Sequence, residues 1–333
     1  MSDWRMAMLA AATILGALPV AAAPAGERVS FESSAPDPAT GKPVTVQGLL
    51  FRPAAAAAPD PRRRPAIVAL HGCGGMYSAV KSRRDALSAR HQAMAELLVA
   101  EGYVVLFPDS FRSRGVEEIC TLEARARRIN GAHRRQDAQA ALAWLQRRDD
   151  VLADRIAVLG WSHGGSAVLA ALDGRAPSVA AWRDRSPQPA YFRAGVAFYP
   201  GCGALAKARR GYTLAAPLTL FVAGSDDWTA PEPCIDIAAR LAAAGEPAAI
   251  TVYPGAHHGF DGPSSQPRLR LDVPNGVNPG RGVTVATDPA ARDDAYEKLK
   301  TFLRTRLAPA ITPTDEASPG RAAELKSPQE GLP

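Results

Sequence analysis

The strongest structural signal in the chain is residues 156–164, which read Ile-Ala-Val-Leu-Gly-Trp-Ser-His-Gly. The first five form the apolar run of a buried strand, and an alanine-rich helical pattern follows over 166–172. A G-x-S-x-G sequence between a strand and a helix is the sharp turn that presents a serine hydroxyl at the carboxyl edge of a sheet. The positive end of the following helix points at the same place. These residues predict a nucleophile at Ser162.

Further strand-like runs lie on both sides of this turn, at 44–51, 66–70, 103–107, 195–199, 218–222 and 249–253. Apolar runs of about five residues suit a parallel sheet that is covered on both faces. Helical patterns alternate with them, at 85–100, 135–148, 166–172, 233–244 and 293–307. The alternation predicts one α/β domain over 26–308, with a mostly parallel sheet of about eight strands and helices on both faces.

Composition excludes several classes of protein. The chain has 333 residues, of which 47% are hydrophobic, so it is not a mainly disordered protein. It carries 39 Lys and Arg against 33 Asp and Glu, a net charge of +6. The basic residues are scattered, whereas nucleic-acid binding needs them on one face. No His or Cys spacing resembles a zinc site, so we expect neither a metal nor another cofactor.

The N-terminus has the pattern of an export signal. Arg5 precedes an apolar run over 6–20, and small residues follow at 21–25. The run is shorter than the ~20 residues that span a bilayer, so we expect no stable membrane span. Residues 1–25 are therefore predicted to be a signal peptide, cleaved after Ala22 or Ala25, on a periplasmic or secreted protein. The Pro-rich segment 309–333 is predicted to be a disordered tail.

Export exposes the four cysteines to an oxidising compartment. Cys202 follows one predicted strand and Cys234 lies beyond the next, so neighbouring strands would bring both to the same edge of the sheet. Cys73 and Cys120 stand in a similar relation after two earlier strands. We predict the disulfides Cys202–Cys234 and Cys73–Cys120, against the alternative of four buried free thiols.

A serine hydroxyl needs a base, and the base needs a carboxylate. His257 and His258 follow the strand at 249–253, and both reach the edge where Ser162 lies. Asp226 and Asp227 follow the strand at 218–222. From the residues alone either member of each pair fits.

The other histidines fit the role of the base less well. His91 and His133 lie in helical patterns and are expected at the surface, and the side chain of His163 should point away from the site.

An oxyanion hole is predicted at the glycine-rich turn His71-Gly72-Cys73-Gly74-Gly75, which follows the strand at 66–70. Such a turn can direct a backbone N–H at the reacting oxygen. We assign the hole to the backbone N–H groups of Cys73 and His163. Cys73 is also a rival candidate for the nucleophile, but it lacks the strand-to-helix turn.

Taken in order, HGCGG at 71–75, PDSF at 108–111, GWSHGG at 160–165, DDWT at 226–229 and YPGAHHGFD at 253–261 resemble the dienelactone hydrolase family of α/β-hydrolases. In that family the catalytic histidine precedes a small residue and an aromatic one, which implies His258. Its catalytic aspartate is followed three residues later by Val or Thr, which implies Asp226 through Thr229.

The resemblance implies a hydrolase of small-molecule carboxylic esters that works through an acyl-enzyme. The founding members have cysteine at the position of Ser162, so ester hydrolysis is the broader interpretation. The alternatives are a serine peptidase of the same fold and a non-catalytic binding protein on a hydrolase scaffold. Arg112 and Arg114 are candidates to face the site and favour an acidic substrate. The segment 261–289 is long and polar, unlike the apolar lid expected of a lipase.

Overall fold

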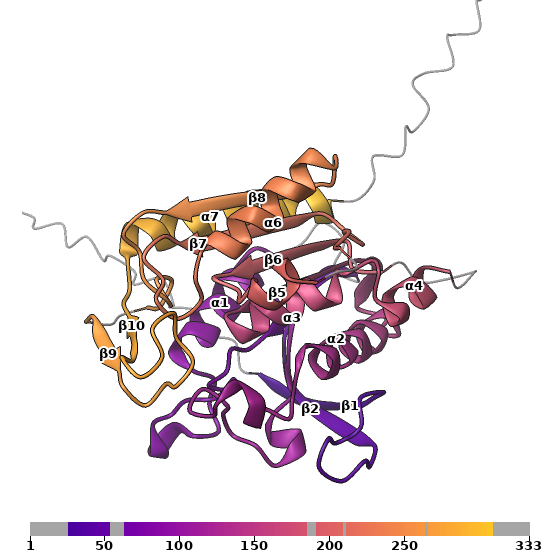
Figure 1. The fold of residues 1–333 in the computed structure, drawn as a ribbon. Coiled ribbons are helices and arrows are strands. Elements are labelled where there is room, and N and C mark those ends of the chain that lie inside the picture. The colour runs from indigo at the N-terminus through magenta and orange to yellow at the C-terminus, as the bar shows by residue number, and fades with distance from the viewer. Residues whose placement is uncertain (1–25, 54–62, 185–190, 209–210, 264–265, 309–333) are drawn as a thin grey trace, which may run out of the picture.

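A computed structural model describes residues 26–53, 63–184, 191–208, 211–263 and 266–308. An eight-stranded sheet crosses the molecule in the order β1-β2-β4-β3-β5-β6-β7-β8 (Figure 1). Its strands are β1 (Glu27–Ser33), β2 (Val44–Phe51), β3 (Arg64–Leu70), β4 (Val104–Asp109), β5 (Val151–Trp161), β6 (Ala194–Phe198), β7 (Leu218–Ala223) and β8 (Ala248–Tyr253). Only β2 runs opposite to the other strands, which makes its pairings with β1 and β4 antiparallel. All other pairings are parallel, so the predicted mostly parallel sheet is confirmed.

Helices cover both faces of this sheet, as predicted. They are α1 (Ala89–Ala100), α2 (Gly131–Gln146), α3 (His163–Ala171), α4 (Pro177–Arg183), α5 (Gly203–Ala206), α6 (Glu232–Ala243) and α7 (Pro289–Leu307). One buried cluster includes Leu142 of α2, Val168 of α3 and Ile237 of α6. The other includes Met94 of α1 and Leu299 of α7. Successive residues of β3 contribute to the two clusters in alternation, because side chains of a strand point to opposite faces.

Several elements were not predicted, including the short helix α5. Strand β1 alternates polar and apolar residues and pairs only with β2, so it lacks the continuous apolar run of the inner strands. The long polar segment 261–289, for which no strand was predicted, contains a small hairpin of β9 (Arg268–Arg270) and β10 (Val283–Val285). These three-residue strands depend on contacts with distant residues. Helix α4 begins at Pro177, beyond the helical pattern at 166–172.

The predicted signal peptide at 1–25 and the predicted tail at 309–333 both lie outside the described residues. Within the described ranges, no helix is both long enough and apolar enough to cross a membrane.

Both disulfides of the sequence analysis are present. Cys73 is bonded to Cys120 with a Cα–Cα distance of 4.9 Å, and Cys202 is bonded to Cys234 with a Cα–Cα distance of 5.2 Å. No cysteine is free. A bonded sulfur cannot act as a thiolate nucleophile, so the rival assignment of Cys73 finds no support in this structure.

Replacing Cys202 and Cys234 together by alanine is expected to lower the free energy of unfolding by about 3–4 kcal/mol. The bond spans 32 residues, and its loss lets the unfolded chain sample more conformations. Thermal unfolding of the double variant and the wild type measures the effect. Alkylation of the purified, unreduced wild type, followed by mass spectrometry, is the control. Four alkylated cysteines would contradict both disulfides.

Candidate active site

Three side chains meet at the carboxyl edge of the sheet at hydrogen-bonding distances. His258 Nε2 lies 3.0 Å from Ser162 Oγ, and His258 Nδ1 lies 2.8 Å from Asp226 Oδ2. Ser162 follows β5, Asp226 follows β7 and His258 follows β8. All three are buried, with 4 to 8% of each residue exposed. The structure therefore brings together the serine, histidine and aspartate that the sequence analysis selected.

The turn that carries Ser162 requires glycine on both sides. Ser162 itself has a φ of 54°, a left-handed conformation that is uncommon for residues other than glycine. A Cβ on Gly164 would lie 2.0 Å from the Leu70 carbonyl oxygen, and one on Gly160 would lie 2.3 Å from the Gly164 carbonyl oxygen. Backbone atoms occupy the space of both missing side chains. The two glycines thus allow the strand, the serine and the helix to pack in this tight geometry.

Asp226 is held as a carboxylate. It accepts hydrogen bonds from the backbone N–H groups of Trp228 and Thr229, at 2.9 and 2.8 Å, and from the Thr229 hydroxyl at 2.8 Å. Burial raises the pKa of Asp226, but the contact with His258 and the bonds from Thr229 outweigh it, and the net pKa is below the ordinary value. The ionised carboxylate can then accept a hydrogen bond from the N–H at His258 Nδ1, which leaves Nε2 free to accept the serine proton.

The neighbouring residue of each pair contacts other parts of the molecule. His257 Nδ1 lies 3.0 Å from the Ser225 carbonyl oxygen. The carboxylate of Asp227 accepts hydrogen bonds from the backbone N–H and the hydroxyl of Thr284, at 2.7 and 2.8 Å. Its carbonyl oxygen accepts a third from the N–H of Val277. Asp227 therefore fixes the β9–β10 segment against the end of β7.

Asp226→Asn should lower kcat about 10⁴-fold, because an amide favours the wrong tautomer of the imidazole. Asp227→Asn leaves the contact between Asp226 and His258 in place, so it should lower kcat by less than about tenfold. Steady-state kinetics on a chromogenic ester compare the two isosteric variants directly. A larger loss at Asp227 than at Asp226 would show that the two roles are reversed.

Cys73 and His163 lie beside Ser162, as the predicted oxyanion hole requires. Together with Ser162 they line a pocket of about 190 Å³, to which Arg127, Trp228 and other residues contribute. The chain before Cys73 runs close to the serine, because a Cβ built on Gly72 would be 3.6 Å from the Ser162 Cβ. The segment is held in place by the Cys73–Cys120 bond and by the Ile119 N–H, which donates to the Cys73 carbonyl oxygen at 2.8 Å.

A buried arginine that the sequence analysis missed joins the two sides of this pocket. Arg134 of α2 donates to the His71 carbonyl oxygen at 2.8 Å, and its Nη1 lies 3.1 Å from His163 Nδ1. Burial, with the positive charges of Arg134 and Arg127, lowers the pKa of His163 to about 3. The neutral His163 ring can thus accept a hydrogen bond from Arg134 at Nδ1. Arg134 lies just before the helical pattern predicted at 135–148, and arginine is usually exposed at the surface. The sequence therefore offered no signal for this contact.

Asp261 is a second buried charged residue that the sequence analysis did not select, and it contacts several side chains around the site. Its carboxylate accepts from the indole N–H of Trp161 at 2.7 Å and the hydroxyl of Tyr199 at 2.6 Å. Arg90 Nε lies 3.0 Å from the same carboxylate. The network links the turn of Ser162, the end of β6 and the loop of His258. The acid in HHGFD was visible in the sequence, but its partners were not.

Several expectations about individual side chains are wrong. His163 is a lining residue of the pocket, and its side chain contacts Arg134 and Phe111. His91 is buried and packs against Trp161, with ring centroids 5.1 Å apart. Neither candidate arginine lines the pocket, since Arg114 forms a buried ion pair with Asp137 at 2.8 Å and Arg112 lies over the Tyr77 ring. Their side chains satisfy structural contacts that the local sequence does not specify.

A mostly parallel sheet with a serine turn after β5, an acid after β7 and a histidine after β8 defines an α/β-hydrolase fold. The model of the dienelactone hydrolase family matches residues 51–307. The chain belongs to the dienelactone hydrolase family, which confirms the resemblance found in the sequence.

Solved structures with the same fold are distant in sequence. A dienelactone hydrolase-like promiscuous phosphotriesterase from metagenomic libraries is 15% identical, with a TM-score of 0.54 over 85% of this chain and 99% of that one. Thermogutta terrifontis esterase 2, phosphorylated by paraoxon, is 19% identical, with a TM-score of 0.54 over 86% and 97%. Porphyromonas gingivalis dipeptidyl peptidase 4 is 17% identical, with a TM-score of 0.54 over 86% of this chain but 36% of that one. The comparison with curated proteins found no match.

Proposed function

We propose that the protein is a serine hydrolase that cleaves carboxylic esters of small molecules through an acyl-enzyme. The observation that carries this proposal is the continuous contact from Ser162 through His258 to Asp226, at 3.0 and 2.8 Å. Ser162 is the nucleophile, His258 is the general base and acid, and Asp226 orients the imidazole. The backbone N–H groups of Cys73 and His163 form the oxyanion hole.

The reaction begins when Ser162 Oγ attacks the ester carbonyl and His258 Nε2 accepts the serine proton. The carbonyl oxygen becomes negative and is stabilised by the N–H groups of Cys73 and His163, at the positive end of α3. His258 then donates its proton to the leaving alcohol, and the acyl group stays on Ser162. His258 accepts a proton from a water molecule that attacks the acyl carbon, and it returns this proton to Ser162 Oγ as the acid is released.

Two alternatives make different predictions. A peptidase of the same fold would cleave amides as well as esters, and a binding protein would cleave nothing. The intact Ser162–His258–Asp226 contact argues against a scaffold that has lost its chemistry. We also propose export to the periplasm or the medium, because two disulfides are stable only in an oxidising compartment.

The test is a panel of esters that differ in acyl length and charge, with the matching anilides beside them, run on the purified protein. Turnover of short-chain esters with no Ser162-dependent turnover of the anilides supports an esterase. Ser162-dependent cleavage of the anilides would indicate a peptidase. No turnover of any compound would indicate a binding protein.

A further inference from the structure

The pocket that contains Ser162 is too small for a whole substrate of ordinary size. Its volume of about 190 Å³ equals roughly six water molecules at ~30 Å³ each. Small-molecule sites usually measure ~300–1,000 Å³. Asn275 restricts the pocket further, because its side chain accepts from the Ala124 N–H and donates to the Leu122 carbonyl oxygen. One half of any larger ester must therefore lie elsewhere.

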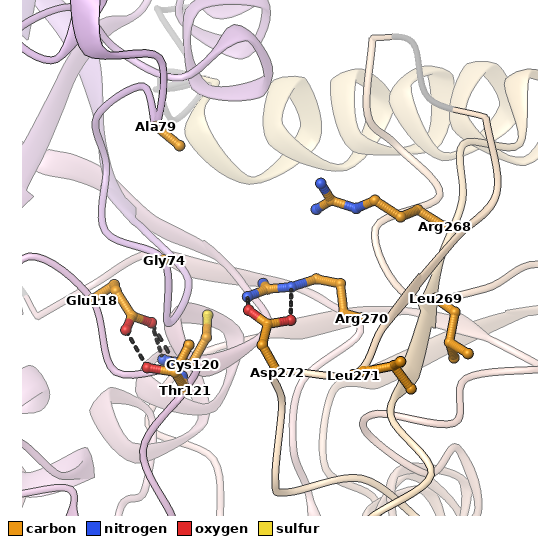
Figure 2. Close-up of a pocket in the computed structure, with 10 residues that line it drawn as sticks. All are labelled: Gly74, Ala79, Glu118, Cys120, Thr121, Arg268, Leu269, Arg270, Leu271 and Asp272. Atoms are coloured by element: carbon orange, nitrogen blue, oxygen red, sulfur yellow. Dashed lines mark hydrogen bonds and ion pairs between the residues drawn. The ribbon is translucent and has the colours of Figure 1, made fainter.

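A larger groove of about 720 Å³ lies between two segments near this pocket. One wall comes from the chain around Gly74 and Cys120, and the other from β9 and the residues after it, 268–272. Figure 2 shows Arg268 and Arg270 extending from the hairpin toward the opposite wall. Both lie on the same side of β9, as expected for residues two apart in a strand.

Two contacts join the groove to the pocket of Ser162. Cys120 lines the groove and is bonded to Cys73, which lines the pocket. Arg270 lines the groove, and its guanidinium lies 5.5 Å from the ring centroid of Trp228, which also lines the pocket. The groove thus borders the pocket along the Cys73–Cys120 bond on one wall and the Arg270–Trp228 contact on the other.

The position of the groove relative to Ser162 and His258 indicates which part of the substrate enters it. The leaving alcohol receives its proton from His258, so it lies on the same side of Ser162 as the imidazole. Trp228 packs against that imidazole, with ring centroids 4.6 Å apart. The path from His258 past Trp228 and Arg270 leads into the groove, and the acyl group is left in the small pocket.

The hairpin wall of the groove carries two arginines, Arg268 and Arg270, against one carboxylate, Asp272. Arg270 is paired with Asp272 at 2.6 Å. The carboxylate of Glu118 accepts hydrogen bonds from the N–H groups of Cys120 and Thr121, at 2.7 and 3.2 Å. Arg268 helps to lower the pKa of Asp272 by its charge, but it makes no hydrogen bond or close ion pair within the ranges that the structure describes, and its side chain faces the open space of the groove. A negative group on the ligand would give it a partner.

We propose that this groove binds the alcohol part of the substrate, so that the enzyme prefers esters of a short acyl group with an elongated, anionic alcohol. Arg268 recognises the negative group, and the acyl chain is limited to a few carbons by the 190 Å³ pocket. This inference rests on the proposed ester hydrolysis at Ser162.

Three acetate esters test it, and they differ only in the alcohol: ethanol, 4′-hydroxybiphenyl-4-carboxylate and the corresponding uncharged carboxamide. Aryl acetates are intrinsically more reactive than ethyl acetate, so the effect is read from a variant: Ala79→Trp, which fills the rim of the groove, should lower kcat/KM for both biphenyl esters tenfold or more. Ethyl acetate turnover should change less than twofold. Equal losses on all three esters, or no loss, would overturn the placement of the alcohol.

The charge preference is tested with Arg268→Gln. The ratio of kcat/KM for the carboxylate to that for the carboxamide should fall roughly three- to fivefold, the size of one exposed ion pair. Comparing this ratio between variants cancels the intrinsic reactivity of the two alcohols. Arg281→Gln, at an exposed arginine of the same segment outside the groove, is the matched control and should leave the ratio unchanged. An unchanged ratio in Arg268→Gln would overturn the role of Arg268.

Failure of the groove and failure of the proposed function give different results. If Ser162-dependent turnover of ethyl acetate is present but the alcohol has no influence, only the groove inference is wrong. If none of the three acetates is cleaved, the proposed ester hydrolysis itself is wrong.

Discussion

Ser162→Ala should lower the rate of ester hydrolysis by a factor of about 10⁴–10⁶. The hydroxyl is the only group in the Ser162–His258–Asp226 contact that can form the acyl-enzyme, and alanine leaves the rest of the site in place. We expect the free energy of unfolding to change little, because the side chain makes its one described hydrogen bond to His258.

Steady-state kinetics with 4-nitrophenyl acetate measure this effect, and a thermal unfolding curve checks the fold. Ser178→Ala is a matched control on α4, outside the pocket, and should retain wild-type activity. Retention of more than about a tenth of the activity in Ser162→Ala would exclude the serine as nucleophile.

His258→Ala should reduce kcat by a similar factor of about 10⁴ or more, since the serine then lacks its base and the alcohol lacks its acid. His257→Ala is the ideal comparison, because it removes the same side chain one residue earlier. Its Nδ1 contacts only the Ser225 carbonyl oxygen among the described residues, so we expect a loss of less than about tenfold. The same ester assay ranks the two variants, and a greater loss at His257 would reassign the base.

The central architecture was predictable because its strands are local signals. The inner strands are short apolar runs. In an α/β pattern, a run of about five apolar residues is typical of a strand in the middle of the sheet, where both faces are covered. Helix starts were less accurate. The predicted start of the first helix at Asp85 is too early, because α1 begins at Ala89, where Ser88 caps it by accepting from the His91 N–H. Asn130 caps α2 before the predicted start at Arg135, a signal that the sequence did contain.

The site was predictable to the extent that it follows strand order. The serine turn is a local pattern, whereas the choice within each His and Asp pair depends on where two adjacent side chains point. The residues alone left both pairs open, and the family resemblance selected His258 and Asp226. Arg134 and Asp261 could not be found, because a buried charge is stabilised by partners that lie far away in sequence.

The most direct test of the account is the position of a covalent adduct. Purified protein is treated with one equivalent of diisopropyl fluorophosphate, which reacts with activated serines. The modified residue is then located by peptide mass spectrometry, while the remaining ester hydrolysis is measured on the same sample. The account predicts one diisopropylphosphoryl group per chain, on Ser162, and a loss of activity in proportion to the labelled fraction. Loss of activity with the label on another residue, or full activity after Ser162 is labelled, would contradict it.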